Sequence, residues 1–513
     1  MTSAPRSARI LRNTLSNSVG KAVSILTTFA MMPFILGELG ESAFGIWALA
    51  TAVISYGTLL DLGIGSAIVK YVAEYQARGD LEAGRALVGT ATLMFSMLAV
   101  VGLALGVALS TQITRFVDVG RVPGADASAV LLLLSTSFAL NLAATPTTAT
   151  LRGLQRYDIT NALSVASALV TAALTVVVLR TGGGLVEMVA LTIPVSATTQ
   201  LIGFVVVRRV EPELTLRWSP ASREAARRLT GFGATLTVSQ LAMLLQKRSS
   251  EVIVAAQLSA AAVAPLSLSR RLSDLPQIIS DQFVKVLLPV ASELHTARDP
   301  AALRRLYLAA TRVTLGLMVP LALAVSWLAG DLLELWIGPS YRQHAELVAL
   351  LVAASVALTS QWPAGAVFQG MGQFGAFAAA SLVSGVVTVV LTLWWVQSSG
   401  LLGVVAAVLV TATAEVMLFR LPYSVVKLEV SLGDLARQVV LPVGVAAVPC
   451  AALLAVADHL TDRPTYLALA LACGGATVVF GATYLAFPAS RRERTVVLTA
   501  ARRLVRRVRS RTA

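Results

Sequence analysis

The sequence predicts an all-α polytopic membrane protein of about fourteen transmembrane helices: two pseudo-symmetric six-helix lobes followed by two additional C-terminal helices. Of the 513 residues, 56% are hydrophobic and only 13% are charged, whereas an average soluble domain is roughly half apolar and about a quarter charged. Apolar stretches of about 20 residues, the length that crosses a bilayer core of ~30 Å, recur along nearly the whole chain. A weak internal repeat relates the two halves.

Short polar breaks divide these apolar stretches into fourteen expected spans. In chain order they are 14–37, 43–68, 86–110, 128–150, 159–179, 185–207, 232–256, 260–290, 308–330, 345–368, 374–396, 400–420, 435–457 and 464–487. The expected organisation is an N-terminal lobe at 1–207, a cytoplasmic linker at 208–231, a C-terminal lobe at 232–430, two further helices at 431–487 and a basic cytoplasmic tail at 488–513. An even number of spans places both termini on the same side.

The distribution of basic residues predicts which side that is. Thirty of the 41 Lys and Arg residues fall in the N-terminus, the C-terminal tail and every second loop. Because short cytoplasmic loops carry an excess of Lys and Arg, we expect both termini in the cytoplasm of a multi-pass protein of the bacterial inner membrane. The same distribution explains the net charge of +14 without a nucleic-acid partner.

Composition and motifs argue against an enzyme. The two cysteines, Cys450 and Cys473, lie in apolar stretches and lack metal-ligand spacing, and the three histidines form no cluster. The sequence contains no Walker A motif, no nucleophile elbow and no HExxH motif. We therefore expect no catalytic residue, no metal and no cofactor.

The internal repeat aligns two loops with two later loops. Residues 74–92 match residues 293–311 at an offset of 219, with Asp80 opposite Asp299. At an offset of 217, Gly153, Tyr157 and Ser164 align with Gly370, Phe374 and Ser381. Weak internal symmetry of this kind is typical of transporters.

Charged side chains inside the expected spans are the candidate functional residues, because a charge deep in a membrane usually faces a partner or a water-filled cavity. In span 8, five polar residues follow at helical spacing from Arg270 to Lys285, and span 1 repeats the pattern. The candidate substrate-binding residues are Asn13, Asn17, Lys21, Lys247, Arg248, Arg270, Arg271 and Lys285. The candidate coupling or cavity carboxylates are Asp61, Glu251, Asp274 and Asp281.

Two interpretations of these charges stay open. The six cations outnumber Glu251, Asp274 and Asp281 by three, and a cationic cavity between the lobes suits an anionic substrate such as a pyrophosphate. Alternatively, three intrahelical ion pairs hold the bundle together: Arg270 with Asp274, Lys247 with Glu251 and Lys285 with Asp281. For Asp61, the alternative to a coupling role is that its carboxylate only stabilises a helix end.

Several segments resemble the polysaccharide-export flippases of the multidrug/oligosaccharidyl-lipid/polysaccharide exporter superfamily. They are Pro33 through Gly45-Ile46-Trp47, LLDLGIGSAIVKYVAEYQARGD at 59–80, LRGLQRYD at 151–158, and 248–290. The resemblance implies a MATE-like fold and a carboxylate in span 7, a position that Glu251 fills. It also implies flipping of a polyprenyl-pyrophosphate-linked oligosaccharide or related glycan precursor by alternating access.

Other functions and partners remain possible from the sequence. A cation-coupled multidrug antiporter of the same superfamily would need uncompensated carboxylates, and a membrane scaffold of a polysaccharide assembly complex would need no polar stripe. The expected partners are the lipid-linked glycan, a coupling cation (H⁺ or Na⁺) and anionic lipids at the C-terminal tail. In that tail, four apolar residues from Val497 to Val508 form one stripe among arginines; a disordered basic tail is the alternative.

Overall fold

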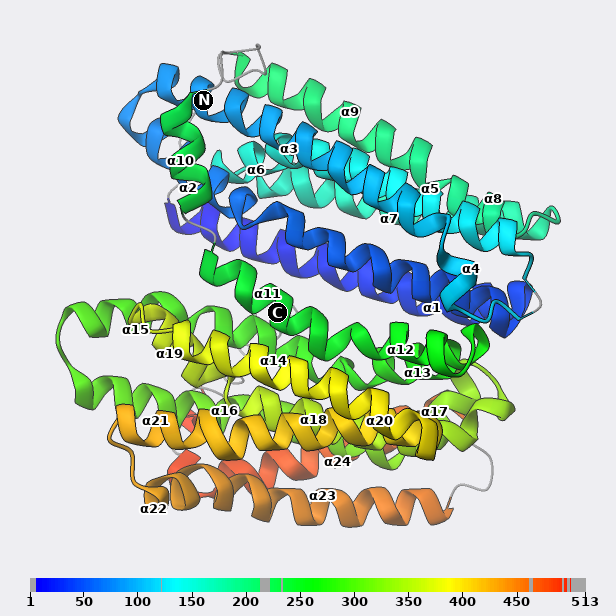
Figure 1. Ribbon diagram of the computed structural model, residues 1–513. Coiled ribbons are helices and arrows are strands. Elements are labelled where there is room, and N and C mark those ends of the chain that lie inside the picture. The colour runs from blue at the N-terminus through cyan, green and yellow to red at the C-terminus, as the bar shows by residue number, and fades with distance from the viewer. Residues whose placement is uncertain are drawn as a thin grey trace, which may run out of the picture. The chain divides into compact units, whose positions relative to one another are not determined.

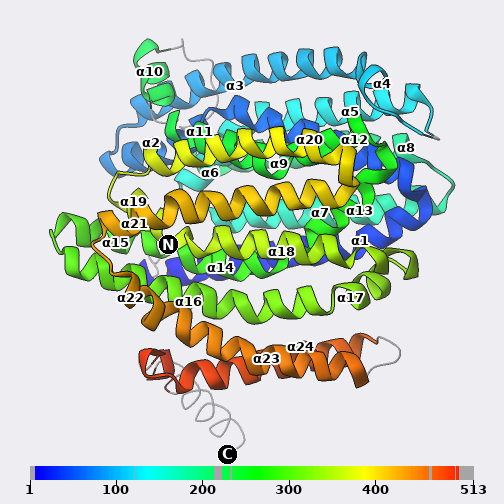
Figure 2. The same cartoon turned by 60° about the horizontal axis from the view of Figure 1, so that its bottom comes forward.

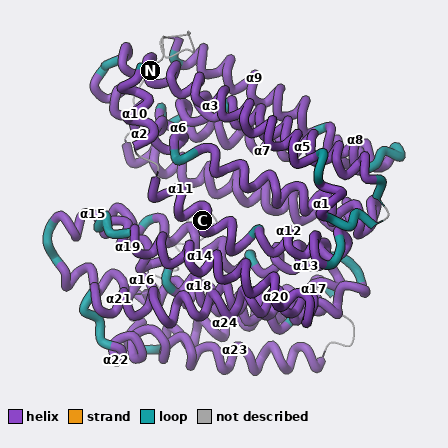
Figure 3. The backbone as a smooth tube through the Cα atoms, in the orientation of Figure 1, coloured by secondary structure: helices purple, strands orange, loops and turns teal. Residues whose placement is uncertain are grey.

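The computed structural model describes residues 6–120, 122–212, 222–231, 234–460, 465–490, 493–495 and 499. These residues form helices and connecting loops without any strand (Figure 3). The chain divides into two compact units, Met1–Ala264 and Pro265–Ala513, here called the first and second unit. The lobe boundaries expected from the sequence stay a prediction, as does lipid binding by the apolar stripe of the tail, which lies outside the described residues.

Helices α1 to α12 build the first unit, in which α2, α6 and α10 lie at one end and α4 and α8 at the other (Figure 1). Their bounds are α1 Arg6–Tyr56, η1 Gly57–Asp61, α2 Ile64–Arg78, α3 Leu81–Ser110, α4 Ile113–Phe116, α5 Gly124–Ala143, α6 Thr145–Gly153, α7 Tyr157–Arg180, α8 Leu185–Ala190, α9 Thr192–Val210, α10 Arg223–Gly231, α11 Ala234–Lys247 and α12 Ser249–Gln257. A core of buried residues from α2, α3, α5, α6 and α10 includes Ile64, Phe95 and Leu229.

The second unit runs from α14 to α24, and α13 (Ala260–Ser273) crosses the division between the units. The bounds are α14 Leu275–Lys285, α15 Leu287–Thr296, α16 Pro300–Trp327, α17 Ala329–Trp336, η3 Pro339–His344, α18 Ala345–Ser360, α19 Trp362–Gly370, α20 Gly375–Ala414, η4 Glu415–Arg420, α21 Leu421–Lys427, α22 Leu432–Leu435, η5 Ala436–Val440, α23 Leu441–Leu460, α24 Tyr466–Ala486 and η6 Pro488–Ser490. Figure 2 shows α23 and α24 side by side.

Ten helical ranges of the described residues are long and apolar enough to cross a membrane. Two of them contain a kink at a glycine with positive φ, Gly40 in α1 and Gly400 in α20. At a rise of ~1.5 Å per residue, the 51 residues of α1 would extend about 77 Å, more than twice a bilayer core of ~30 Å. Each kink lies where the sequence predicts a boundary between two spans, near 37–43 for Gly40 and near 396–400 for Gly400.

The multi-pass, all-α fold is confirmed, whereas the count of fourteen spans stays a prediction. The expected spans 232–256 and 260–290 consist of shorter helices, α11 to α15, which break near Arg248, Asp274 and Val286. None of these pieces is among the ten ranges. Large apolar side chains on the long helices are exposed, including Val100, Trp394 and Leu418, as a lipid-facing surface requires.

The segment expected to be a linker is partly a helix packed on the first unit. Leu229 of α10 is fully buried in the core of that unit, and the Arg228 guanidinium donates to the Tyr75 hydroxyl at 2.8 Å and to Glu224 at 2.7 Å. Electrostatic interaction with Tyr75, and to a smaller extent with Glu224, raises the pKa of the Arg228 guanidinium. Residues 213–221 of the segment lie outside the described residues.

The loops that the internal repeat aligns have equivalent local structures in the two units. Asp80 caps α3 by accepting from the Ala83 backbone N–H at 3.1 Å, and Asp299 caps α16 by accepting from the Ala302 N–H at 2.8 Å. These residues lie 219 positions apart. The residue before each cap has a positive φ, 70° at Gly79 and 55° at Arg298.

The turn between α6 and α7 has the same backbone as the turn between α19 and α20. In the first unit, the Arg156 N–H donates to the Leu151 carbonyl at 2.8 Å and Gln155 has φ 59°. In the second unit, the Gln373 N–H donates to the Phe368 carbonyl at 2.8 Å and Gly372 has φ 72°. Both turns are Schellman motifs that end a helix on a left-handed residue.

This equivalence predicts opposite effects at the two left-handed positions. Gln155→Gly should stabilise the protein by about 1 kcal/mol, because a Cβ is disfavoured at positive φ. Gly372→Ala should destabilise it by a similar amount. Thermal unfolding of the purified variants in detergent measures both changes, and shifts of the same sign would contradict the assigned backbone.

Candidate functional site

In the first unit, α11 and α12 meet at two of the sequence-predicted residues, Arg248 and Glu251. The Arg248 Nη1 atom lies 3.3 Å from the Glu251 Oε2 atom, and the Glu251 side chain is only 2% exposed. Tyr56, the last residue of α1, lies within electrostatic reach of both charges. The neighbouring Lys247 ends α11. Glu251 is thus a buried carboxylate neutralised by an adjacent guanidinium.

Helix α1 and the turn after it carry the other candidates of this unit. Lys21 is exposed near the start of α1, and the side chains of Asn13 and Asn17 lie outside the described residues. Asp61 ends η1, and its Oδ1 atom accepts the Gly65 backbone N–H at 2.8 Å. Asp61 therefore holds the start of α2, as a helix-end carboxylate does.

In the second unit, α13 and α14 carry the remaining candidates. Arg270 and Arg271 lie in the last turn of α13, where Arg270 is buried and Arg271 half-buried. Asp274 precedes α14. The Lys285 Nζ atom lies 2.7 Å from the Asp281 Oδ2 atom, four residues earlier on α14. This contact is one of the intrahelical ion pairs that the sequence offered as an alternative.

Sequence reasoning missed a network of neutral polar side chains between α5 and α9. The Asn141 amide nitrogen donates to the Ser137 carbonyl at 2.8 Å and to the Ser196 hydroxyl at 3.2 Å. The Gln200 amide donates to the Asn141 carbonyl oxygen at 2.8 Å, and the two serine hydroxyls lie 3.1 Å apart. Each helix carries two polar residues four positions apart, Ser137 with Asn141 and Ser196 with Gln200. This spacing places each pair on one face of its helix and could have indicated the network.

The chemistry of this network suits hydroxyl-rich ligands. Amides and hydroxyls both donate and accept hydrogen bonds, and Asn141 is exposed. A partly exposed amide on a spanning helix is unfavourable against lipid, so it is expected to face another polar group or a water-filled space. We refer to Ser137, Asn141, Ser196 and Gln200 as the amide network.

A second missed group is a buried ion pair within the second unit. Arg420 contacts the Glu415 Oε1 atom at 2.6 Å, donates to the Ser381 hydroxyl at 2.7 Å and lies 5.5 Å from the centre of the Phe377 ring. The Glu415 and Arg420 side chains are 1% and 12% exposed. Because Ser381 also donates to Glu415 at 2.9 Å, the two charges satisfy one another and anchor the helices.

In the described part of the chain, no group of three or more His, Cys, Asp or Glu side chains is placed to hold a metal ion. Three carboxylates named above, Glu251, Asp281 and Glu415, each contact an arginine or lysine.

Comparisons with known proteins agree with this architecture. Residues 39–346, more than half of the chain, match a family described as polysaccharide biosynthesis protein. The uncharacterized membrane protein EpsK of Bacillus subtilis (strain 168) is 23% identical over 402 residues, which cover 77% of this chain and 79% of EpsK.

Two solved structures share the fold. The lipid II flippase MurJ in an inward closed conformation has a TM-score of 0.69 at 12% identity, with 93% of this chain and 99% of MurJ covered. An inward-facing multidrug resistance MATE family transporter of the MOP superfamily has a TM-score of 0.68 at 15% identity, with 81% of this chain and 98% of the transporter covered. The MATE-like fold expected from the sequence is therefore confirmed.

Proposed function

Because the chain belongs to the polysaccharide biosynthesis protein family, we propose that it is a membrane transporter that flips a polyprenyl-pyrophosphate-linked oligosaccharide or a related glycan precursor across the bacterial inner membrane. The family match over residues 39–346 carries this proposal. The likeness to a lipid II flippase supports it at the level of the fold.

The polar groups of the first unit suit such a substrate. The amide network offers neutral donors and acceptors for sugar hydroxyls, and Lys21, which is exposed near the start of α1, offers a cation for the pyrophosphate. The pairing of Glu251, Asp281 and Glu415 with basic residues argues against a multidrug antiporter, because a cationic drug needs a carboxylate that no internal cation already neutralises. Alternating access, a coupling H⁺ or Na⁺ and cytoplasmic termini remain parts of the proposal.

Replacing Asn141 tests the proposal directly. Asn141→Leu keeps the side-chain volume but removes the hydrogen bonds, so flipping should fall about tenfold or more if these groups contact the sugar. The measurement is the rate at which a fluorescent polyprenyl-pyrophosphate-linked sugar becomes accessible to an external quencher in proteoliposomes. Membrane abundance and the melting temperature are recorded for the same preparation.

Thr136→Val is the matched control on the same helix. Among the residues that the structure describes, the Thr136 hydroxyl donates only to the Leu132 carbonyl of its own helix, at 2.9 Å, so its loss should change flipping less than twofold, well below the tenfold effect of breaking the network. Wild-type flipping by Asn141→Leu would refute the sugar contact. No flipping of any lipid-linked sugar by the wild-type protein would refute the function itself.

A further inference from the structure

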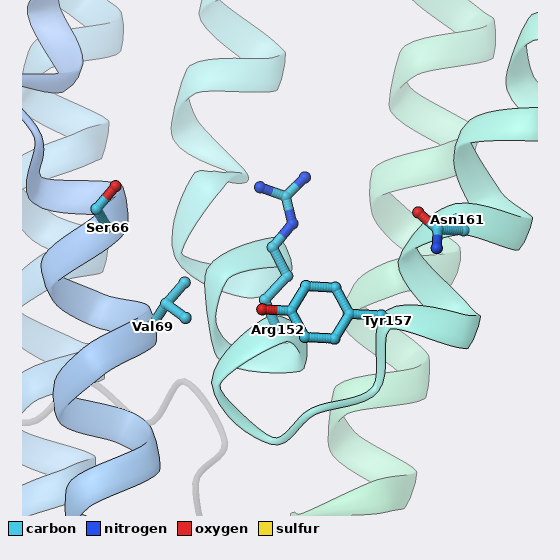
Figure 4. Close-up of a pocket in the computed structure, with 5 residues that line it drawn as sticks. All are labelled: Ser66, Val69, Arg152, Tyr157 and Asn161. Atoms are coloured by element: carbon cyan, nitrogen blue, oxygen red, sulfur yellow. The ribbon is translucent and has the colours of Figure 1, made fainter. Parts of the chain in front are cut away.

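The first unit contains an open cavity to which the proposed sugar contacts assign no role. It has a volume of about 350 Å³ and is lined by Ser66 and Val69 of α2, Arg152 of α6, and Tyr157 and Asn161 of α7. Figure 4 shows Arg152 and Tyr157 between the two α2 residues on one side and Asn161 on the other. This volume lies within the range of about 300–1,000 Å³ that small-ligand sites occupy.

The backbone of α6 and α7 fixes the walls of this cavity. Gly153 allows α6 to approach α2, because a Cβ there would lie 2.8 Å from the Val72 Cβ and 3.1 Å from the Val69 carbonyl oxygen. The Schellman turn that follows α6 then starts α7 at Tyr157. Arg152 and Tyr157 are thereby held at opposite ends of one short, fixed turn.

The lining is cationic and rich in donors. Arg152 is its one charged member, and the serine, tyrosine and asparagine side chains supply two hydroxyls and one amide. Within the described part of the chain, no hydrogen bond or ion pair joins the Arg152 guanidinium to another residue. Arg156, by contrast, lies 3.2 Å from Asp158.

The equivalent turn in the second unit can be compared with this one, and it shows that the fold does not require polar residues at these positions. At the 217-residue offset, the counterparts of Arg152, Tyr157 and Asn161 are Gln369, Phe374 and Ala378. There Phe374 stacks on Phe377 at 6.1 Å, and Phe377 packs against Phe368 at 5.1 Å. The counterpart of Ser66 at the 219-residue offset is Lys285, which is ion-paired with Asp281.

We propose that this cavity binds a phosphate group of a lipid headgroup, with Arg152 as its cationic ligand. A guanidinium presents two parallel N–H groups to phosphate oxygens, and the Tyr157 and Ser66 hydroxyls that line the same cavity are further hydrogen-bond donors. Val69 leaves one wall apolar. That this phosphate belongs to the transported lipid rests on the proposed function. Phosphate binding at Arg152 does not depend on that function.

Binding of farnesyl pyrophosphate to the full chain in phosphatidylcholine nanodiscs tests the proposal. Arg152→Gln introduces the residue that the second unit carries at the equivalent position, so the helix should tolerate it. The dissociation constant should rise about tenfold or more, as the loss of a charge-assisted hydrogen bond implies. Farnesol, which lacks the phosphates, should not bind.

Arg156→Gln is the matched control, because it removes the same charge four residues away and outside the lining. Its dissociation constant should stay within about twofold of the wild type, as expected for a half-buried arginine that is ion-paired outside the lining. An unchanged constant in Arg152→Gln, an equal loss in Arg156→Gln, or farnesol binding as tightly as farnesyl pyrophosphate would each overturn the proposal.

Competition identifies the source of the phosphate. Displacement by phosphatidylglycerol in the nanodisc would show a general anionic headgroup site, and displacement by inorganic pyrophosphate alone would show selectivity for the diphosphate; both outcomes support phosphate binding at Arg152. Flipping is measured separately with the same variants. If Arg152→Gln binds farnesyl pyrophosphate as tightly as the wild type and the wild-type protein flips its substrate, this site is rejected and the proposed function is unaffected.

Discussion

The Gly45→Ala variant is expected to lose most of its folded protein from the membrane. Gly45 lies in the part of α1 that follows the kink at Gly40, and a Cβ there would overlap the Ala260 carbonyl group, with the carbonyl carbon only 2.6 Å away. The Ala260 backbone cannot easily yield, because its N–H donates to the Asp118 carbonyl at 3.0 Å. Overpacking against fixed backbone costs about 3 kcal/mol or more, a large fraction of the stability of a typical protein.

The matched control for this variant is Gly37→Ala on the same helix. No atom lies within 4 Å of a Cβ built at Gly37, so this change should be neutral or stabilise the helix by up to about 1 kcal/mol. Membrane abundance and thermal unfolding in detergent measure both variants. A Gly45→Ala protein that melts at the wild-type temperature would show that α1 and the start of α13 are not in contact.

The second large effect is expected at Glu415. Glu415→Ala leaves the Arg420 guanidinium, 12% exposed, without its carboxylate inside the helix bundle, and breaking a buried ion pair costs about 3–5 kcal/mol. The doubly neutral variant, Glu415→Gln with Arg420→Gln, should be less destabilised than Glu415→Ala, because no lone charge remains. Thermal unfolding of Glu415→Gln, Arg420→Gln and the doubly neutral variant, each compared with the wild type, gives the coupling energy.

The exposed pair on α14 serves as the control for that cycle. Lys285 and Asp281 are 63% and 31% exposed, so their coupling should be no more than about 0.5 kcal/mol. An equally small coupling at Glu415 and Arg420 would contradict the buried position of that pair.

Local signals predicted the regular parts of the fold. Hydropathy placed the long helices, and the breaks expected near residues 37–43 and 396–400 coincide with the kinks at Gly40 and Gly400. The repeat placed Asp80 and Asp299 at equivalent helix starts. These features depend on residues that are close in sequence, so the pattern alone reveals them.

Contacts between distant residues could not be predicted in this way. Arg312 and Glu493, 181 positions apart, form a buried ion pair at 2.6 Å, although the sequence placed Arg312 near the start of the expected span 308–330 and Glu493 in the tail. Asn141 and Gln200 are ordinary polar residues until packing brings α5 beside α9. The breaks in α11 to α15 escaped notice because apolar composition hides a local interruption of the helical hydrogen bonds.

The turn after α6 closes through hydrogen bonds between backbone groups. The turn after α19 has the same backbone, so Arg152 and Tyr157 occupy the positions that Gln369 and Phe374 occupy in the second unit. One backbone frame therefore carries a guanidinium and a phenol in the first unit, and a neutral amide beside a packed aromatic ring in the second. The turn fixes where these side chains begin, and the residue types determine the chemistry found there.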